Sequence, residues 1–193
     1  MNTRSILALL VSGALFGALP VATGQQRPET PQQVAQRYVY ALKAGDWRGM
    51  ASLMHPDALR QLRAMFQPVI ERPEAAQLRQ QLLGVQSVAE ARALSNVALF
   101  ASIMRTMSGR ETGQGDALKS ATIRIIGEVP EGRDTVHVVY RVGLPMEGIT
   151  LSQMEVMTLG RMGNRWRGLL KGEFFAMAAG LRRAMEGPRR DRN

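Results

Sequence analysis

The apolar residues of this chain change their spacing across the segment Gly109–Asp116. Before the segment they recur every three or four residues, which is typical of amphipathic helices. After it they alternate with polar residues, as in half-buried strands. The segment itself holds glycines and charges but no apolar residue, which predicts a connector. A helical part followed by a strand-rich part indicates an α+β fold.

Local signals mark the first helices. Thr30-Pro31-Gln32-Gln33 offers a capping threonine, a proline at the first helical position and a glutamine that can return the capping hydrogen bond. Gly45 predicts the end of this helix, and Asp46 is suited to cap a second, short one. His55-Pro56-Asp57 then begins a third helix.

The second part of the chain predicts a sheet. Period-two patterns indicate strands near 122–125, 135–142, 149–161 and 165–171, with Gly163-Asn164 as a tight hairpin between the last two. We expect one α+β domain over residues 31–186. The N-terminal helices and a C-terminal helix would pack on a curved, mainly antiparallel sheet of four to six strands, with a helical insertion at 74–108.

The first 24 residues have the features of a secretory signal peptide. Arg4 gives a positive start, Ile6–Val21 is apolar and uncharged, and small residues precede Gln25, where we expect cleavage. A membrane anchor needs about 20 apolar residues, whereas this run is shorter and is interrupted by Pro20. The mature protein would be periplasmic or extracellular, with a disordered lead-in over residues 25–30.

Charge indicates the kind of surface such an exported chain can meet. Lys and Arg number 25 and Asp and Glu 16, a net charge of +9. Arg4 is the only charged residue of the signal peptide, so the mature chain would carry +8. An exported protein rarely meets nucleic acid, and we expect none as a partner. Arginines recur in the last dozen residues, which include the basic tail 187–193. They either lie in solvent at a helix end and in the tail, or make weak contact with an anionic membrane.

Common enzyme motifs do not occur in the sequence. It contains no phosphate-binding loop, dinucleotide glycine fingerprint, zinc-spaced histidine pair or nucleophile elbow. With two histidines and no cysteine, a usual zinc site would have to use carboxylates, so we expect neither a metal nor a cofactor. The 12 methionines are typical core residues, although they can also line a permissive ligand pocket.

Two groups of candidate catalytic residues remain. His137 and Arg141 share the polar face of a strand, and with Glu155 they would form a polar site if that face lines a cavity. His137 would then be a general base, and Arg141 or Tyr140 would stabilise an oxyanion. If the face meets solvent, it is an ordinary wet surface.

His55 and Asp57 form the second group. His55 precedes a proline at a helix start, where its commonest role is to shape the turn or cap the helix. If the first group does not converge, this pair at the mouth of the fold is the remaining catalytic candidate.

Residues 34–57, VAQRYVYALKAGDWRGMASLMHPD, carry a family resemblance. They resemble the start of the nuclear transport factor two-like superfamily, in which a helix ends in an A-x-x-x-G-D step and a short W-x-x-M-x-x-L-M-H-P-D helix follows. The matching positions are Ala41, Gly45, Asp46, Trp47, Met50, Leu53, His55, Pro56 and Asp57. Trp166, which follows the Gly163-Asn164 turn, suits the curved sheet that closes these cones.

The resemblance implies an exported bacterial member with a cone-shaped pocket. Ketosteroid-isomerase-like, SnoaL-like, dehydratase and cyclase members use Asp, His, Tyr or Arg inside the cone, while others bind ligands or mediate association. We expect a non-catalytic protein that binds a small apolar or amphipathic ligand in the cone, or a protein partner through it. The alternative is a small-molecule isomerase, dehydratase or hydrolase. The sequence leaves the oligomeric state open and allows a dimer.

Overall fold

The computed structural model describes residues 28–110, 119–146 and 148–186. Its strands follow a series of helices and precede one final helix, and the predicted α+β class is confirmed. The predicted signal peptide, residues 25–27 of the lead-in, most of the Gly109–Asp116 connector and the tail 187–193 lie outside the described residues. The elements in chain order are α1 (Pro31–Ala44), α2 (Trp47–Ser52), α3 (Pro56–Met65), α4 (Gln67–Glu71), the 3₁₀ turn η1 (Pro73–Ala75), α5 (Ala76–Leu83), α6 (Val88–Ala93), α7 (Asn96–Arg110), β1 (Thr122–Glu131), β2 (Thr135–Met146), β3 (Ile149–Met162), β4 (Arg165–Gly168) and α9 (Gly172–Glu186).

The first helices begin and end where local side chains predict. The Thr30 hydroxyl accepts a hydrogen bond from the Gln33 N–H, and the Gln33 side chain accepts one from the Thr30 N–H. Gly45 ends α1 with φ 65°, in the left-handed region that favours glycine. Asp46 Oδ1 accepts the Gly49 N–H at 2.8 Å and caps α2. Short-range capping therefore sets the helix boundaries at this end of the chain.

The described strands form one antiparallel sheet in the order β1-β2-β3-β4. β2 and β3 pair without a register shift, from Thr135 opposite Gly160 to Met146 opposite Ile149. The β3–β4 turn lies at Gly163-Asn164, as predicted. β4 ends at Gly168, three residues before the predicted end of that strand, because the chain then turns into α9.

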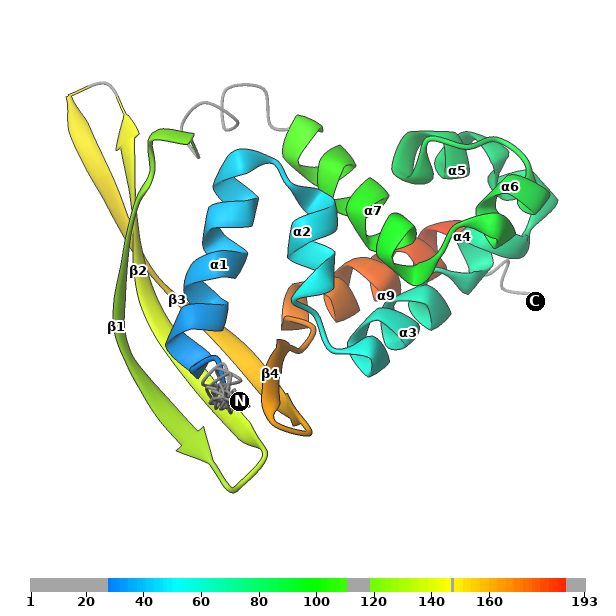
Figure 1. Cartoon of the computed structure of the whole chain (residues 1–193). Helices are drawn as coiled ribbons and strands as arrows, with labels where there is room; N and C mark the ends of the chain where they lie inside the picture. The colour runs from blue at the N-terminus through cyan, green and yellow to red at the C-terminus, as the bar shows by residue number, and fades with distance from the viewer. Residues whose placement is uncertain (1–27, 111–118, 147, 187–193) are drawn as a thin grey trace, which may run out of the picture.

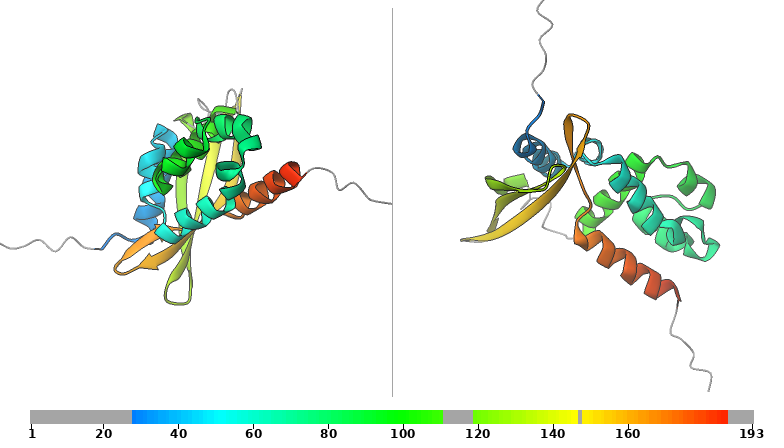
Figure 2. Two further views of the ribbon diagram at one scale, coloured as in Figure 1. Left: turned by 90° about the vertical axis from the view of Figure 1, so that its right-hand side faces the viewer. Right: turned by 90° about the horizontal axis from the view of Figure 1, so that it is seen from below.

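The helices lie on the concave side of the sheet (Figure 1). α1 packs on this side against β1, β2 and β4, and α2 packs against both α1 and α7. α3 to α6 gather with α7 away from the strands, and α9 starts near the sheet and runs outward next to α3 (Figure 2). The stretch 74–108, predicted to be helical, holds α5, α6 and most of α7.

A buried arginine organises this helical part. Arg79 on α5 is 2% exposed. Its Nε donates to the Gln86 carbonyl at 2.9 Å, and its Nη1 donates to the carbonyls of Val69 at 3.0 Å and Arg72 at 2.7 Å. The Val69 and Arg72 carbonyls lie at the end of α4, where intrahelical donors run out. Arg79 thus joins α4, α5 and the loop that follows α5.

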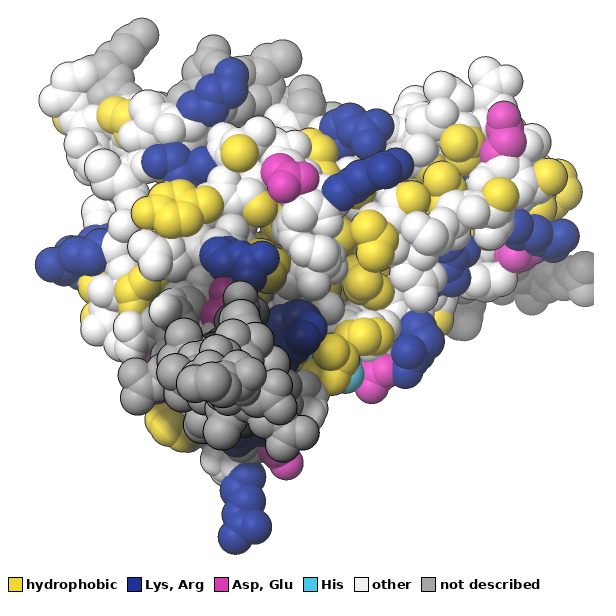
Figure 3. Space-filling model, viewed as in Figure 1, with side chains coloured by type: hydrophobic (Ala, Val, Ile, Leu, Met, Phe, Trp, Pro, Cys, Tyr) yellow, Lys and Arg dark blue, Asp and Glu magenta, His cyan; other side chains and the backbone are white. Residues whose placement is uncertain are grey.

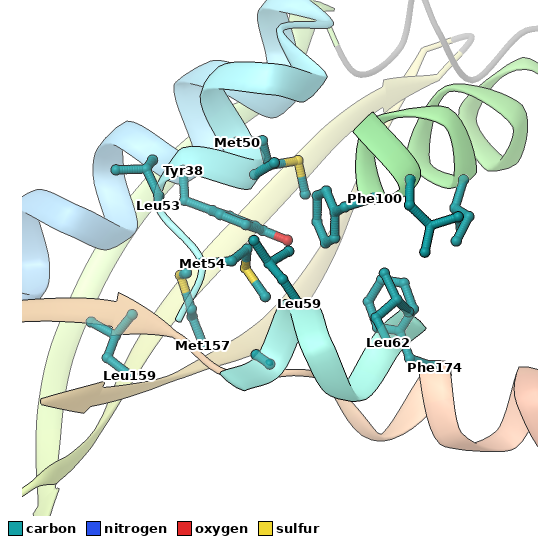
Figure 4. Packing of buried hydrophobic residues seen from close by; sticks show 14 of the residues in the cluster. Tyr38, Met50, Leu53, Met54, Leu59, Leu62, Phe100, Met157, Leu159 and Phe174 are labelled. Atoms are coloured by element: carbon teal, nitrogen blue, oxygen red, sulfur yellow. The ribbon is translucent and has the colours of Figure 1, made fainter. Parts of the chain in front are cut away.

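The core lies between the sheet and the first helices (Figure 4). Tyr38 of α1 points into it, towards Met54 and Phe100, and Met157 and Leu159 close it from β3. Phe100 also meets Phe174 of α9, with ring centroids 6.2 Å apart. These side chains are at most 7% exposed, so they fill the space under the sheet.

The concave face of β2 and β3 divides into two halves of different burial. The proximal half consists of residues 135–140 and their partners 155–160, and the distal half of residues 141–146 and 149–154. In the proximal half the inward side chains of Val138 and Leu159 are fully buried. In the distal half Leu151 is 49% and Ile149 62% exposed. The helices therefore cover one half of this face and leave apolar side chains exposed on the other.

Candidate functional site

The structure separates the first group of predicted site residues. Side chains alternate along a strand, and directly paired antiparallel residues share a face. Tyr140 pairs with Glu155, so both lie on the concave face. His137 and Arg141 have odd positions on β2 and lie on the opposite, convex face. His137 and Arg141 therefore do not converge with Glu155, as the predicted site requires.

Glu155 instead belongs to a polar cluster of four residues, Tyr140, Gln153, Glu155 and Lys171. Lys171, in the link from β4 to α9, donates from Nζ to Glu155 Oε2 at 2.7 Å. Gln153 Nε2 donates to Glu155 Oε1 at 2.8 Å. The Lys171 and Glu155 side chains are 28% and 24% exposed. The cluster therefore lies where the concave face changes from its buried to its exposed half.

Burial and neighbouring charge set the protonation of this cluster. Burial raises the pKa of Tyr140, although the nearby Lys171 ammonium opposes the shift. Burial of Lys171 disfavours its charged form, but Tyr140 and Glu155 outweigh this and raise its pKa. Burial, with Tyr140 and Glu173 nearby, also raises the pKa of Tyr38. At neutral pH the cluster thus holds the neutral phenol of Tyr140 and the ammonium group of Lys171, and the neighbouring Tyr38 is also neutral.

This arrangement favours donation of hydrogen bonds over abstraction of protons. Both oxygens of Glu155 already accept a hydrogen bond, from Gln153 and from Lys171. Lys171 is protonated at neutral pH and cannot act as a base there. What the cluster can offer a ligand is a phenol or ammonium donor to an oxygen atom.

His137 has partners on the convex face. Its Nε2 lies 2.7 Å from Glu131 Oε2, and its Nδ1 lies 3.0 Å from Thr158 Oγ1. These contacts join the end of β1, β2 and β3. Arg141 is exposed on the same face.

His55 and Asp57 form a helix cap. His55 Nδ1 accepts the Asp57 backbone N–H at 3.1 Å, and the Asp57 carboxylate pairs with Arg60 one turn later. The His55 backbone N–H donates to the Gly168 carbonyl at 2.8 Å and joins the start of α3 to β4. The capping role considered for His55 from the sequence is the one that its ring performs here.

Three of the surface hollows in the described part of the chain are lined by residues other than those of the polar cluster. One of these three, of about 820 Å³, opens between the start of α1 and the β3–β4 turn. Its wall includes Arg37, Arg165, Arg167 and Tyr40. Lysine and arginine side chains are spread widely over this side of the molecule (Figure 3). The hollow is thus a basic surface feature rather than an internal pocket.

Sequence reasoning did not identify Lys171 or Gln153 as site residues. Lys171 had one usable signal: it lies between the apolar pairs Leu169-Leu170 and Phe174-Phe175, with Glu173 as the only other charge between them. A charge in such an apolar stretch needs a partner. Identifying Glu155 as that partner requires the register of β3.

In the described ranges no helix has the length and apolar character needed to span a bilayer. Within the same residues, no group of three or more histidine, aspartate or glutamate side chains could hold a metal ion.

Comparisons of the chain with protein-family models, with curated proteins and with solved structures found no match.

Proposed function

We propose that this chain is an exported, non-catalytic protein that binds a protein partner on the distal half of its concave sheet face. The observation that carries the proposal is the exposure of Ile149 and Leu151 on that face, 62% and 49% respectively. They face the same way as the half-buried Val142 and Leu144 of β2. Together these four residues form a contiguous apolar surface next to the polar cluster, as in protein-binding patches with a polar rim.

A protein partner suits this face better than a small ligand enclosed in the cone. Tyr38, Phe100, Met157 and Leu159 already fill the space under the proximal half. The remaining apolar surface is open, whereas ligand sites usually enclose most of their ligand. A second chain can cover such a surface, and Tyr140 and Lys171 would supply donors at its margin.

Export rests on the sequence of residues 1–24. Membership of the nuclear transport factor two-like superfamily stays a prediction. Intact-mass measurement of protein recovered outside the cytoplasm tests export, since a mature chain that starts at Gln25 is expected. A chain retained in the cytoplasm with Met1 to Gly24 present contradicts it.

The polar cluster favours one alternative, a small-molecule isomerase, dehydratase or hydrolase. In that case Tyr140 and Lys171 would donate hydrogen bonds to a developing oxyanion. Native mass spectrometry distinguishes the two proposals. A small-molecule adduct on the natural chain that is lost from Tyr140→Phe supports the enzyme, and an adduct-free chain supports the partner.

Site-specific photo-cross-linking tests the partner directly. A photoreactive residue at position 151 in the exported chain is expected to give one discrete product with a second, different protein. The matched control is position 77, where Gln77 is exposed on α5. Replacement of Ile149 by serine is expected to abolish the product. Equal products from positions 151 and 77, or none from either, contradict the proposal.

A further inference from the structure

One edge of β3 has no neighbouring strand over most of its length. β4 pairs only with Leu159–Met162, and the Leu169 N–H bonds to the Thr158 carbonyl at 2.9 Å. Residues 149–157 pair with β2 on one side, and no described strand pairs with them on the other. This stretch of nine residues is the free edge.

The hydrogen-bond pattern shows which backbone groups the free edge presents. The Arg161 N–H donates to the Asp134 carbonyl at 2.8 Å, and the β2–β3 register then continues unshifted. Odd-numbered residues of β3 therefore direct their N–H and C=O groups to β2, and even-numbered residues direct theirs away. The outward groups belong to Thr150, Ser152, Met154 and Val156, which are all exposed.

The opposite edge of the sheet is protected and the free edge is not. β1 carries a register shift between Ile125 and Gly127, a proline at position 130 and several charges. Bulges, prolines and charges are the usual means by which proteins prevent edge strands from pairing. The free edge contains no proline or lysine. Its one charge, Glu155, is held by Lys171 on the concave face.

We infer that the free edge pairs, antiparallel, with the free edge of a second copy of this chain. A two-fold axis at Gln153 uses all nine residues and stops short of the strand that pairs with β4. Thr150 then pairs with Val156 of the other copy, and Ser152 with Met154. Each outward N–H meets a carbonyl, as a self-complementary interface requires.

Charge also favours a second copy in this register. Glu155 stands opposite Leu151 of the other copy, so the two carboxylates are about 13 Å apart along the ladder. The two sheets join into one, and their concave faces lie side by side. This pairing goes beyond the proposed partner, because it uses the backbone edge rather than the concave side chains.

Cysteine cross-linking tests this register, since the chain has no cysteine of its own. Gln153→Cys places the two thiols in a directly opposed, non-hydrogen-bonded pair, whose Cα separation of about 4.5 Å allows a disulfide. The control Thr150→Cys on the same edge puts its thiols about 20 Å apart. Mild oxidation of the mature chain is expected to give covalent dimer from Gln153→Cys only. Equal yields from both variants, or no dimer from either, overturn the register.

Sedimentation velocity over a concentration series tests the pairing without a covalent bond. The natural chain is expected to dimerise. Ser152→Pro, which removes one outward N–H, is expected to weaken the dimer at least about tenfold. Ser152→Thr keeps the N–H and should dimerise normally.

Met154→Lys gives a second test should the proline variant not fold. A natural chain that stays monomeric at all concentrations overturns the inference, whereas cross-linking to a different protein through position 151 would still support the proposed function.

Discussion

The two halves of the β2–β3 ribbon have the same pairing and the same alternation, yet they differ in what covers them. The proximal half meets α1, the start of α9 and the core, and its inward side chains are buried. The distal half continues the ribbon with Leu144, Ile149 and Leu151 on the same face, and the latter two are exposed. Apolar alternation in a strand therefore predicts a face that can be covered, and not which molecule covers it.

Matched leucine truncations in β3 should separate the two halves most strongly. Leu159→Ala opens a cavity in the covered half and should lower the free energy of unfolding by about 2–5 kcal/mol. Leu151→Ala removes an exposed side chain and should change it by less than about 0.5 kcal/mol. Urea denaturation of the two variants at low protein concentration measures both values. Similar losses for the two variants would show that the distal half is covered after all.

Alkaline titration tests the burial of the tyrosines at the boundary. The folded-state pKa values of Tyr38 and Tyr140 are raised above the usual 10.0, and that of Lys171 above 10.5. As pH rises past 10, the unfolded chain loses these protons while the folded chain keeps them, so stability should fall. Urea midpoints from pH 8 to 11 should show the fall, and Tyr38→Phe should make it shallower. An unchanged slope in Tyr38→Phe would contradict the burial of that hydroxyl.

Helix starts could be predicted because their causes lie within a few residues. Thr30 bonds with Gln33, and Asp46 caps the second helix through Gly49, as the sequence indicates. The turn at Gly163-Asn164 is equally local. Such signals sufficed for the boundaries of the first helices and for one hairpin turn, while the periodicity of apolar residues sufficed for the fold class.

The candidate site depended on information that is not local. Alternation placed His137 and Arg141 on one face of β2, but only the register shows that Glu155 belongs with Tyr140 on the other. Lys171 reaches Glu155 from a link 16 residues away. Strand register and the path of a link follow from packing of the whole domain, so no pattern in the sequence showed them.

A double-mutant cycle tests the polar cluster at the boundary. Glu155→Gln and Lys171→Met each break the 2.7 Å ion pair. Because both groups are half-buried, we expect a coupling of about 1 kcal/mol in the free energy of unfolding. Urea denaturation of the two single variants and the double variant gives this value. Additive effects would mean that the pair contributes nothing to holding the link against β3.

The smallest expected effect concerns the other end of the molecule. Arg182 and Arg183 are exposed on α9, and each basic residue near an anionic surface contributes about 1 kcal/mol at low salt. Replacing either by glutamine should weaken co-sedimentation with phosphatidylglycerol vesicles about fivefold, with little binding left at physiological salt. Leu151→Ser in the distal half should leave this binding unchanged. No difference between the arginine variants and the natural chain would remove the membrane contact.

Residue-resolved amide hydrogen exchange by NMR tests the division of the ribbon most directly. In dilute protein the N–H groups of Thr150, Ser152 and Met154 should exchange rapidly, while those of Leu151 and Gln153, bonded to β2, should exchange slowly. At concentrations where the chain dimerises, the even-numbered positions should become protected and the odd-numbered ones should not change. Equal slow exchange at odd and even positions in dilute protein would contradict the account, because it would mean that the free edge is already paired within a single chain.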